Sequence, residues 1–444
     1  MYNLPYKGAG LMLSEISIRN PKRNKYSKNG RSGWYEYYAG YSADFVSDAI
    51  NYAHIPEGSA ILDPWNGSGT TTQIAYEMGY TAYGYDINPV MFIIAKARQL
   101  DVGVKNSLNA INNDILAKAK RNKTFEYTNN DPLQAWFDTA TVSTIRNIEH
   151  CIRKLLVDEK AISRNSPVDN FNNISDLASF FYVVLFRTVR QLVIPFIASN
   201  PTWVKVAKDK SELQHWEVSD IHNIYISIFN EMVNEFDLHS PECTPERKNR
   251  INLGIANSED LPISMNSIDA IISSPPYCTR IDYAISTRPE LAILGFSEQD
   301  IDVLRRKMIG TPKISQELPG IDSIWGLTCL EFINKVANHD SKASRSYYYK
   351  HFLQYFNGIN KSILELDRVL KRDGICILVL QDSYFKDVHN DLPQILTEMA
   401  HNIEWKIKYR VDFNSNLSMA NINRKTKQYR SRISTTETVL AFQK

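Results

Sequence analysis

A glycine-rich loop between two short apolar segments is the feature that most restricts how this chain folds. The loop spans residues 63–71 and reads D-P-W-N-G-S-G-T-T, directly after an apolar segment at residues 60–62. Residues 71–78 have the composition of a helix, Gly79 is a helix stop, and residues 81–85 read as a second strand. A strand, a tight loop, a helix and another strand in this order are typical of a doubly wound α/β sheet.

The α/β pattern is interrupted once and then resumes. Residues 101–250 are expected to be mostly helical, with long helices over residues 133–156 and 174–197. From about residue 251 the α/β pattern returns, with predicted strands at 268–272, 375–380 and 438–442 and an amphipathic helix over 352–370. We therefore divide the chain into a basic N-terminal arm (1–33), a first half of the sheet domain (34–102), a helical insertion (103–250) and a second half (251–444).

Composition excludes several classes of protein. The chain has 444 residues, 43% hydrophobic and 23% charged, with a net charge of +2, which excludes a disordered or collagen-like chain. Its five cysteines include no C-x-x-C pair and its nine histidines no H-x-x-x-H spacing, so we predict no metal site. Residues 177–186 form an uncharged stretch too short to span a bilayer, and the N-terminus has no apolar signal run. We expect a buried helix at that stretch and a cytoplasmic protein that does not enter membranes.

The loop also predicts the kind of ligand. Gly67 and Gly69 let the backbone turn tightly and let a ligand come close to it. No lysine follows Gly69 as in a Walker A loop, and Thr72 breaks the dinucleotide pattern. Asp86 ends the next predicted strand, where an acid hydrogen-bonds the two ribose hydroxyls in doubly wound folds. A ligand with a ribose and no pyrophosphate fits, and S-adenosylmethionine is one, with Asp63 facing its cationic end.

A second motif, Ser274-Pro275-Pro276-Tyr277, follows the predicted strand at 268–272. The two prolines hold the backbone extended and lack N–H groups, so the loop offers acceptors: the Ser274 hydroxyl and nearby carbonyls. Acceptors on both N–H bonds of a nucleobase amine favour a pyramidal nitrogen, whose lone pair can attack a sulfonium methyl. Tyr277 offers a face on which a base turned out of the duplex can stack. In isolation, the same residues equally fit a rigid turn with an aromatic plug.

Together the two motifs resemble those of the amino-methylating DNA methyltransferases. In that family the donor loop reads D-P-F-x-G-S-G-T-T, with Trp65 here in the Phe place, and the catalytic loop reads [D/N/S]-P-P-[Y/F/W]. The stretches 37–42, 368–374 and 437–440 also resemble family elements, so the likeness covers residues 35–100, 251–300, 360–385 and 432–444. The resemblance implies an α/β fold of the class I methyltransferase (Rossmann-like) type, a doubly wound sheet with a mainly helical insertion.

The resemblance also implies roles for the motif residues. The catalytic loop, Ser274 to Tyr277, would hold the target amine, and no metal is needed. The family has an acid near the donor's adenine, and Asn257 stands at that place here, with Asp260 as a rival. The residues implied in binding S-adenosylmethionine are Tyr38, Asp63, Pro64, Gly67, Ser68, Gly69, Thr70, Asp86 and Asn257.

We therefore predict a site-specific methyltransferase that acts on the exocyclic amine of a flipped base in double-stranded DNA. Within the family, Ser in the first catalytic position goes mainly with cytosine N4, and Asp or Asn mainly with adenine N6. Ser274 thus favours cytosine N4, and adenine N6 is the first alternative. An RNA base-amine methyltransferase and a non-catalytic partner subunit are the others. A cognate restriction or defence nuclease is the expected partner, and the oligomeric state is not predicted.

Basic residues gather in three stretches, at 19–31, 118–123 and 424–432. One such stretch is usually a solvated face, but three in a nearly neutral chain favour a basic DNA-binding cleft. The insertion is the first candidate to read the DNA sequence. Trp203 within it either approaches that cleft or, as we expect, packs in the core. Arg280 and Arg288 follow the catalytic loop, where they either bind phosphates or pair with nearby acids, Asp282 and Glu290.

Overall fold

The computed structural model of the protein describes residues 18–22, 30–36, 40–121, 130–157, 171, 173–198, 203–236, 250–278, 281–415 and 435–444. Several residues of the sequence predictions lie outside these ranges. They are Tyr38, Lys123, Arg280, residues 23–29 of the basic stretch at 19–31 and all of the basic stretch at 424–432.

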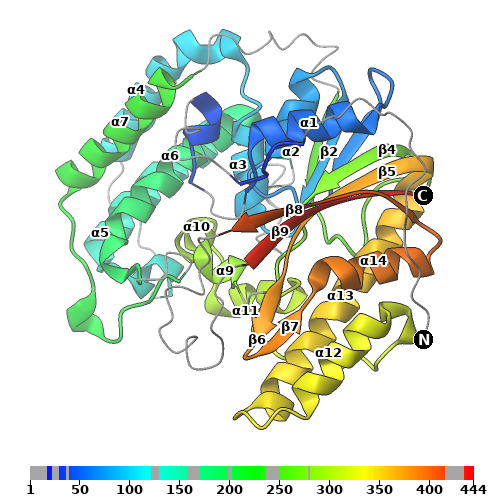
Figure 1. Cartoon of the computed structure of the whole chain (residues 1–444). Helices are drawn as coiled ribbons and strands as arrows, with labels where there is room; N and C mark the ends of the chain where they lie inside the picture. Colours follow the sequence, from blue (N-terminus) through cyan, green and yellow to red (C-terminus); the bar gives the residue numbers. More distant parts are fainter. Residues whose placement is uncertain are drawn as a thin grey trace, which may run out of the picture.

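A seven-stranded sheet forms the centre of the protein, with the strand order β3-β2-β1-β4-β5-β9-β8 (Figure 1). The strands are β1 (Ala60–Asp63), β2 (Thr81–Asp86), β3 (Ile251–Ile255), β4 (Ile268–Ser273), β5 (Leu370–Gln381), β8 (Lys406–Ser415) and β9 (Thr435–Gln443). Strands β1 to β5 are parallel, and β9 runs antiparallel between β5 and β8. This mainly parallel sheet with one reversed strand is the class I methyltransferase (Rossmann-like) arrangement, so the predicted fold class is confirmed.

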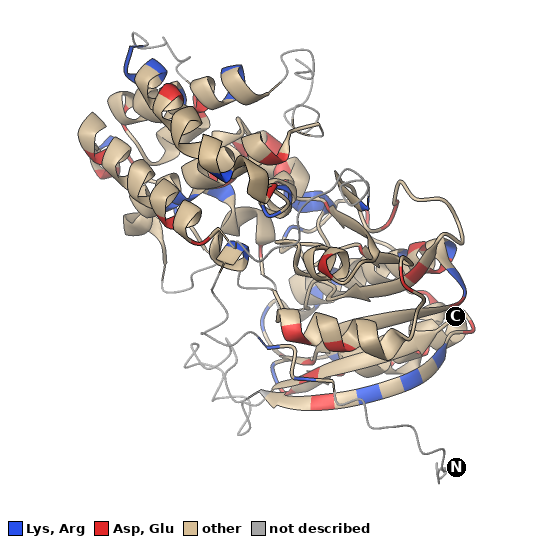
Figure 2. Cartoon of the chain, turned by 90° about the horizontal axis from the view of Figure 1, so that it is seen from above, with Lys and Arg blue, Asp and Glu red and all other residues tan. Residues whose placement is uncertain are grey.

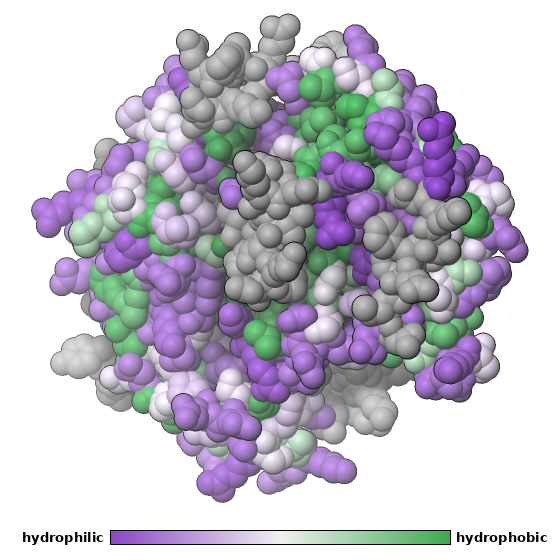
Figure 3. Space-filling model, turned by 180° about the vertical axis from the view of Figure 1, so that it is seen from behind, coloured by the Kyte–Doolittle hydropathy of each residue, from purple (hydrophilic) through white to green (hydrophobic). Residues whose placement is uncertain are grey.

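Helices cover both faces of the sheet because its strands are apolar on both sides. Along β4, Ala270 and Ile272 face one core and Ile271 faces the other. The first core lies under α1 (Ala43–Ala53) and α2 (Thr70–Glu77). The second lies under α12 (Leu327–Ala337), α13 (Tyr349–Val369) and α14 (Leu392–Asn402). Viewed from the opposite side to Figure 1, hydrophobic surface residues lie in separate areas among hydrophilic ones (Figure 3).

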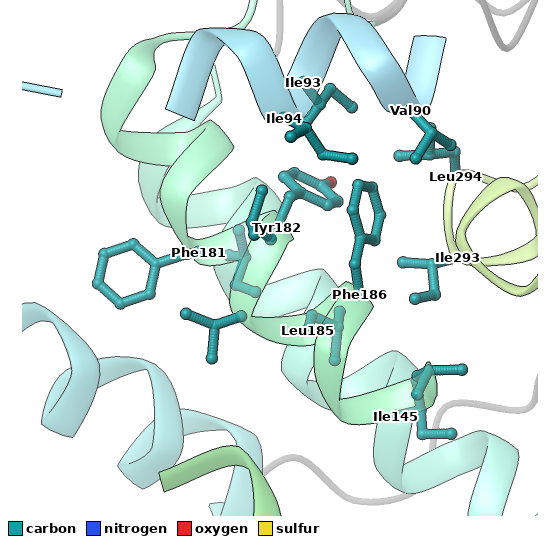
Figure 4. Close-up of a cluster of buried hydrophobic side chains, with 14 of the residues drawn as sticks. Val90, Ile93, Ile94, Ile145, Phe181, Tyr182, Leu185, Phe186, Ile293 and Leu294 are labelled. Carbon is teal, nitrogen blue, oxygen red and sulfur yellow. The ribbon is translucent and has the colours of Figure 1, made fainter. Parts of the chain in front are cut away.

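A separate group of helices lies beside the sheet (Figure 1). It consists of α4 (Lys105–Arg121), α5 (Thr139–Leu156), α6 (Asp176–Leu192) and α7 (Val218–Asn234). Figure 4 shows Tyr182 of α6 against Ile94 of α3 (Pro89–Ala97) and Phe186 of α6 facing Ile293 of α10 (Arg288–Ile293). Each fully buried side chain of this kind contributes about 1.5–3 kcal/mol. The group is therefore joined to the sheet domain by a continuous apolar core, and the uncharged stretch at 177–186 is the buried helix that the sequence predicts.

The long helices predicted in this region are shorter in the structure. The first begins only at Thr139, because Asp138 caps it by accepting from the Thr141 N–H at 2.9 Å, and a 3-10 turn (η3, Pro132–Ala135) precedes it. The second ends at Leu192 and passes into another 3-10 turn (η5, Ile194–Phe196) that contains a proline. The prediction that Trp203 packs in the core is wrong, since 43% of its surface is exposed.

The edge strand β8 and the remaining short elements complete the fold. Lysine and arginine residues, blue in Figure 2, alternate along β8 at the sheet edge and are exposed. Charged residues on an edge strand disfavour its pairing with a strand of another molecule. Among the described residues, no helix is long and apolar enough to cross a membrane, and no cluster of potential metal ligands is found. The remaining elements are η1 (Gly30–Gly33), η2 (Val102–Val104), η6 (Lys210–Glu212), α9 (Tyr283–Ser286), α11 (Glu298–Lys307), η7 (Ser323–Trp325), η8 (Ser344–Tyr348), β6 (Ser383–Phe385) and β7 (Val388–Asn390).

Candidate functional site

The glycine-rich loop connects β1 to α2 and lies directly on α3. Gly67 and Gly69 have φ angles of 48° and 83°, in the left-handed region that favours glycine. A Cβ atom added to Gly69 would lie 2.9 Å from the Cβ of Ala95 on α3, closer than packed carbon atoms come. Pro64 is buried at the start of the loop, and Thr70 is half-buried as the first residue of α2. Backbone conformation and packing thus both require glycine at position 69.

Replacing Gly69 with alanine is expected to lower the free energy of unfolding by about 1–2 kcal/mol for the left-handed backbone alone, and further for the contact with Ala95. Gly58→Ala is the matched control, because Gly58 also has a positive φ of 81° but no atom within 4 Å of an added Cβ. Thermal unfolding of both variants measures the difference. Equal losses in the two variants would contradict a packing role for Gly69.

Two further residues hold the loop in place. The backbone N–H of Asn66 donates to the carbonyl of Tyr85 on β2 at 3.0 Å, and its side-chain oxygen accepts from the Thr72 hydroxyl at 3.0 Å. The carbonyl of Ser68 accepts a hydrogen bond of 2.6 Å from the guanidinium of Arg98, which is only 1% exposed. The loop is thus fixed from both the sheet and the end of α3, so its shape exists before any ligand binds.

Asp63, the last residue of β1, is a buried carboxylate that joins the two motifs. One of its oxygens accepts from the Tyr41 hydroxyl at 2.8 Å. The other accepts from the Ser273 hydroxyl at 2.5 Å and from the Trp65 N–H at 3.2 Å. Burial raises the pKa of Asp63, and these hydrogen bonds oppose the shift. Ser273 directly precedes the S-P-P-Y loop, so this bond ties the glycine-rich loop to the S-P-P-Y loop.

Asp86, the last residue of β2, lies on the other side of the glycine-rich loop. One carboxylate oxygen accepts from the Gly67 N–H at 2.9 Å, and the other accepts from the Asn88 N–H at 2.8 Å. Burial raises the pKa of Asp86 to about 6, although both hydrogen bonds act in the opposite direction. Each carboxylate oxygen can accept more than one hydrogen bond, so both can still accept from a ligand.

Asn257 follows β3 and lies next to the end of β2. The Ala256 N–H donates to the carbonyl of Asp86 at 3.2 Å, which places the two strand ends side by side. Asn257 is half-buried and its side-chain oxygen accepts from the Glu259 N–H at 3.3 Å, whereas Asp260 is exposed. Asn257 is therefore the more enclosed of the two residues considered for this position.

The S-P-P-Y loop leaves β4 with its first hydroxyl already oriented. The Ser274 hydroxyl donates its proton to the carbonyl of Val379 on β5 at 3.0 Å. A serine hydroxyl has one proton and two lone pairs, so the Ser274 oxygen is left as an acceptor. Pro275, which follows, is buried and has no N–H to donate.

The other end of the loop is held by two hydrogen bonds. The hydroxyl of Tyr277 donates to a carboxylate oxygen of Glu437 on β9 at 2.9 Å. The hydroxyl of Tyr355 on α13 donates to the carbonyl of Pro276 at 2.8 Å. Burial is the main cause that raises the pKa of Tyr277 far above its usual value, and the Glu437 charge adds to it, so the phenol stays protonated.

The sheet order brings the predicted site residues to one edge. Asp63, Asp86, Asn257 and Ser274 end or follow β1, β2, β3 and β4, which are adjacent parallel strands (Figure 1). The carboxyl ends of such strands form the edge where open α/β sheets bind ligands. All the predicted site residues except Tyr38, which lies outside the described residues, belong to this edge or to the two loops beside it.

Comparison with known proteins finds similarity to DNA methyltransferases. Residues 14–97 match the family model described as DNA methylase. The chain is 22% identical over 330 residues to the Type II methyltransferase M.BsoBI of Geobacillus stearothermophilus, which is 67% of this chain and 60% of that protein. This chain is a relative of the amino-methylating DNA methyltransferases. Two further relatives are M.MvaI of Kocuria varians (22% identical; 78% of this chain, 74% of the relative) and M.AvaI of Nostoc sp. (24%; 84% and 79%).

Two arginines, Arg280 and Arg288, follow the S-P-P-Y loop, and the sequence leaves open whether they bind phosphates or pair with nearby acids. Arg288 donates to Glu298 at 3.0 Å, and not to Glu290. Glu290 is fully buried and instead binds Arg190 of α6 and the hydroxyl of Tyr35, the latter at 2.9 Å. Pairing of Arg288 with Glu290, one of the two sequence alternatives, is therefore wrong.

Asp282 is also engaged elsewhere in this structure. Its carboxylate accepts from the guanidinium of Arg305 on α11 at 2.8 Å, and it caps α9. Arg305 lies 23 residues beyond Asp282, so the sequence gives no local signal for this pair. Arg280 is outside the described residues, so its contacts stay a prediction.

Sequence reasoning missed several residues of the site, among them Ser273, Tyr41, Arg98, Tyr355 and Glu437. Ser273 adjoins the S-P-P-Y motif and Tyr41 lies within the stretch 37–42, so both were close to recognised signals. Arg98 has no sequence signal, because its role depends on the fold bringing the end of α3 under the loop.

Proposed function

We propose that this protein transfers a methyl group from S-adenosylmethionine to the exocyclic amine of a base in double-stranded DNA. The observation that carries the proposal is the hydrogen bond from Ser273 to Asp63, which joins the glycine-rich loop to the S-P-P-Y loop at neighbouring strand ends. A methyl donor held by the first loop would then lie beside an amine held by the second. The likeness to Type II methyltransferases supports DNA as the substrate.

The residues at the sheet edge fit the methyl donor chemically. The sulfonium donor is cationic at its amino-acid end, and the buried Asp63 would supply a negative charge there. Asp86 would accept from the ribose hydroxyls, and the amide oxygen of Asn257 would accept from the adenine amine. Because Gly67 and Gly69 carry no side chain, the ligand could lie against the loop backbone, with Pro64, Ser68, Thr70 and, by resemblance, Tyr38 completing the site.

The catalytic step follows from the acceptors of the S-P-P-Y loop. The Ser274 oxygen and the Pro275 carbonyl would accept the two N–H bonds of the target amine, which directs the nitrogen lone pair toward the methyl carbon. The nitrogen then attacks that carbon, the carbon–sulfur bond breaks, and its electron pair stays on sulfur. The nitrogen returns to neutrality by losing one proton to solvent. Tyr277 would stack on the base after it has left the duplex.

The target base is proposed as cytosine, with methylation at N4. Support comes from Ser274 in the first catalytic position, by its tendency within the family, and adenine N6 is the second candidate. The insertion, residues 103–250, is proposed as the region that reads the DNA sequence. The basic stretches are proposed as phosphate contacts, apart from Arg31, which is buried and donates to the carbonyl of Arg98 at 2.7 Å. A restriction or defence nuclease is proposed as the partner of the modification activity.

The function is tested by single-molecule sequencing of DNA from cells that express the protein, with the Ser274→Ala variant as control. We expect a modified cytosine or adenine at one recurrent site with the wild type and none with the variant. Incorporation of a labelled methyl group into RNA but not DNA would favour the RNA alternative. No incorporation into any nucleic acid would favour a non-catalytic partner subunit.

Donor binding is expected to strengthen as the pH rises through about 6, the pKa of Asp86. Ribose hydroxyls donate better to a carboxylate than to a carboxylic acid, so the protonated form at lower pH binds more weakly. Calorimetric titration with S-adenosylmethionine from pH 5 to 8 measures the effect. Asp86→Asn should bind weakly with little pH dependence in this range, and a variant that keeps the wild-type pH profile would contradict the role of Asp86.

A further inference from the structure

Glu437 has a partly buried carboxylate that contacts Tyr277 of the S-P-P-Y loop. It is the third residue of β9, and its oxygen accepts the hydroxyl proton of Tyr277 at 2.9 Å. Burial raises the pKa of Glu437, and the bond from Tyr277 opposes this shift. Burying a carboxylate costs free energy unless it accepts hydrogen bonds. The hydrogen bond from Tyr277 therefore offsets part of the cost of burying Glu437.

The start of β9, which carries Glu437, is itself fixed in position. The Asp382 carboxylate accepts from the Thr436 N–H at 2.7 Å, and the Asp382 N–H donates to the Thr436 carbonyl at 3.1 Å. The Gln381 side chain also donates to the Thr435 hydroxyl at 3.1 Å. These bonds link the last residues of β5 to the first residues of β9, so Glu437 presents its carboxylate from a rigid position.

Tyr277 is consequently held at both of its ends. Its backbone follows Pro276, whose carbonyl accepts from Tyr355, and its hydroxyl is bound to Glu437. A tyrosine ring can rotate about two side-chain bonds, and fixing the hydroxyl removes most of that freedom. The orientation of the ring face is therefore determined by β9, a strand far from the S-P-P-Y motif in the sequence.

We propose that Glu437 is a positioning residue for the target base, acting through Tyr277. By fixing the ring of Tyr277, it orients the face on which the flipped base stacks, and so brings the base amine to the acceptors of Ser274 and Pro275. This inference rests on the proposed function, and it extends that function to a residue that contacts neither the donor nor the base.

The test is a cycle of Tyr277→Phe, Glu437→Ala and the double variant, measured as single-turnover methyl transfer at saturating DNA and donor. Both single variants remove the hydrogen bond between Tyr277 and Glu437 while keeping the aromatic ring, so each should lower the rate by about tenfold. Tyr277→Phe also removes the contact of the Tyr277 hydroxyl with Ser274, and Glu437→Ala, which keeps that contact, isolates the bond to Glu437. The double variant should lose no more than either single variant. Glu437→Gln keeps an acceptor oxygen and should retain a rate near that of the wild type.

Controls separate positioning from general stability. Donor affinity and melting temperature should stay near wild-type values in Tyr277→Phe and Glu437→Gln. Glu331→Ala, at a glutamate exposed on α12, should leave the rate unchanged. If Glu437→Ala does not fold, Tyr277→Phe and Glu437→Gln still test the inference.

The outcomes distinguish this inference from the proposed function. Rate losses that multiply in the double variant, or a Glu437→Ala variant as active as the wild type, would overturn the inference alone. So would a full-rate Tyr277→Phe variant. A wild-type protein that transfers no methyl group to DNA would overturn both.

Discussion

Replacing Ser274 with alanine is expected to lower the rate of methyl transfer by about a hundredfold or more, with donor affinity unchanged. The Ser274 proton is committed to the Val379 carbonyl, so the lost atom is an oriented acceptor that alanine cannot replace. Methyl transfer under single-turnover conditions and calorimetric donor titration measure the two quantities. Tyr277→Ala is expected to show the same pattern, because the base loses the face on which it stacks.

A matched control is Ser47→Ala on α1. The Ser47 hydroxyl also donates to a backbone carbonyl, that of Ala43 at 3.2 Å, but it is not part of the sheet edge. This variant should retain the wild-type rate. Loss of donor binding in Ser274→Ala, with an unchanged fold, would count against the role assigned to Ser274.

Replacing Asp63 with asparagine should weaken donor binding by at least about thirtyfold, which corresponds to roughly 2 kcal/mol for a lost charge at a binding site. Stability should change much less, because burial already disfavours the ionised carboxylate and asparagine keeps an oxygen that can accept from the Tyr41 or the Ser273 hydroxyl. Calorimetry with the donor and thermal unfolding measure the two effects separately.

Asp63→Ala provides the contrast. It removes every acceptor from the Tyr41 and Ser273 hydroxyls, so the free energy of unfolding should fall by about 1–3 kcal/mol in addition to the loss of donor binding. If the asparagine and alanine variants lost the same stability, the hydrogen bonds to Asp63 would not be the link between the two loops.

The sequence predicts the sheet domain well because its signals are local. The turn at Gly67 and Gly69 and the strand before Ser274 depend on neighbouring residues, and both lie where expected. The limits of the helices at Thr139 and Leu192 were predicted less well. At both places the hydrophobic pattern continues beyond the helix. The capping residue Asp138 fixes the start of α5, and the proline in η5 follows the end of α6.

Contacts between distant segments account for most of what the sequence could not predict. Glu290 binds Arg190 on α6, and Arg98 binds the loop from the end of α3, and neither partner is near in sequence. Trp203 reads as a core residue by its type, but its exposure depends on which helices surround it. The charge or hydrophobicity of a residue predicts that it needs a partner in the folded protein, but it does not identify that partner.

The apolar contact between α3 and α6 means that helices α4–α7 are not a detachable module. Helix α3 begins just after Asp86 and is capped by Asn88, whose side chain also donates to Thr287 beside α10 at 2.9 Å. Removing α6 would expose the hydrophobic side of α3 and thereby loosen the segment that positions Asp86. Exchange of this region between relatives would therefore require matching changes along α3 and α10, so the DNA recognition proposed for this region and the donor binding proposed for Asp86 would be constrained to change together.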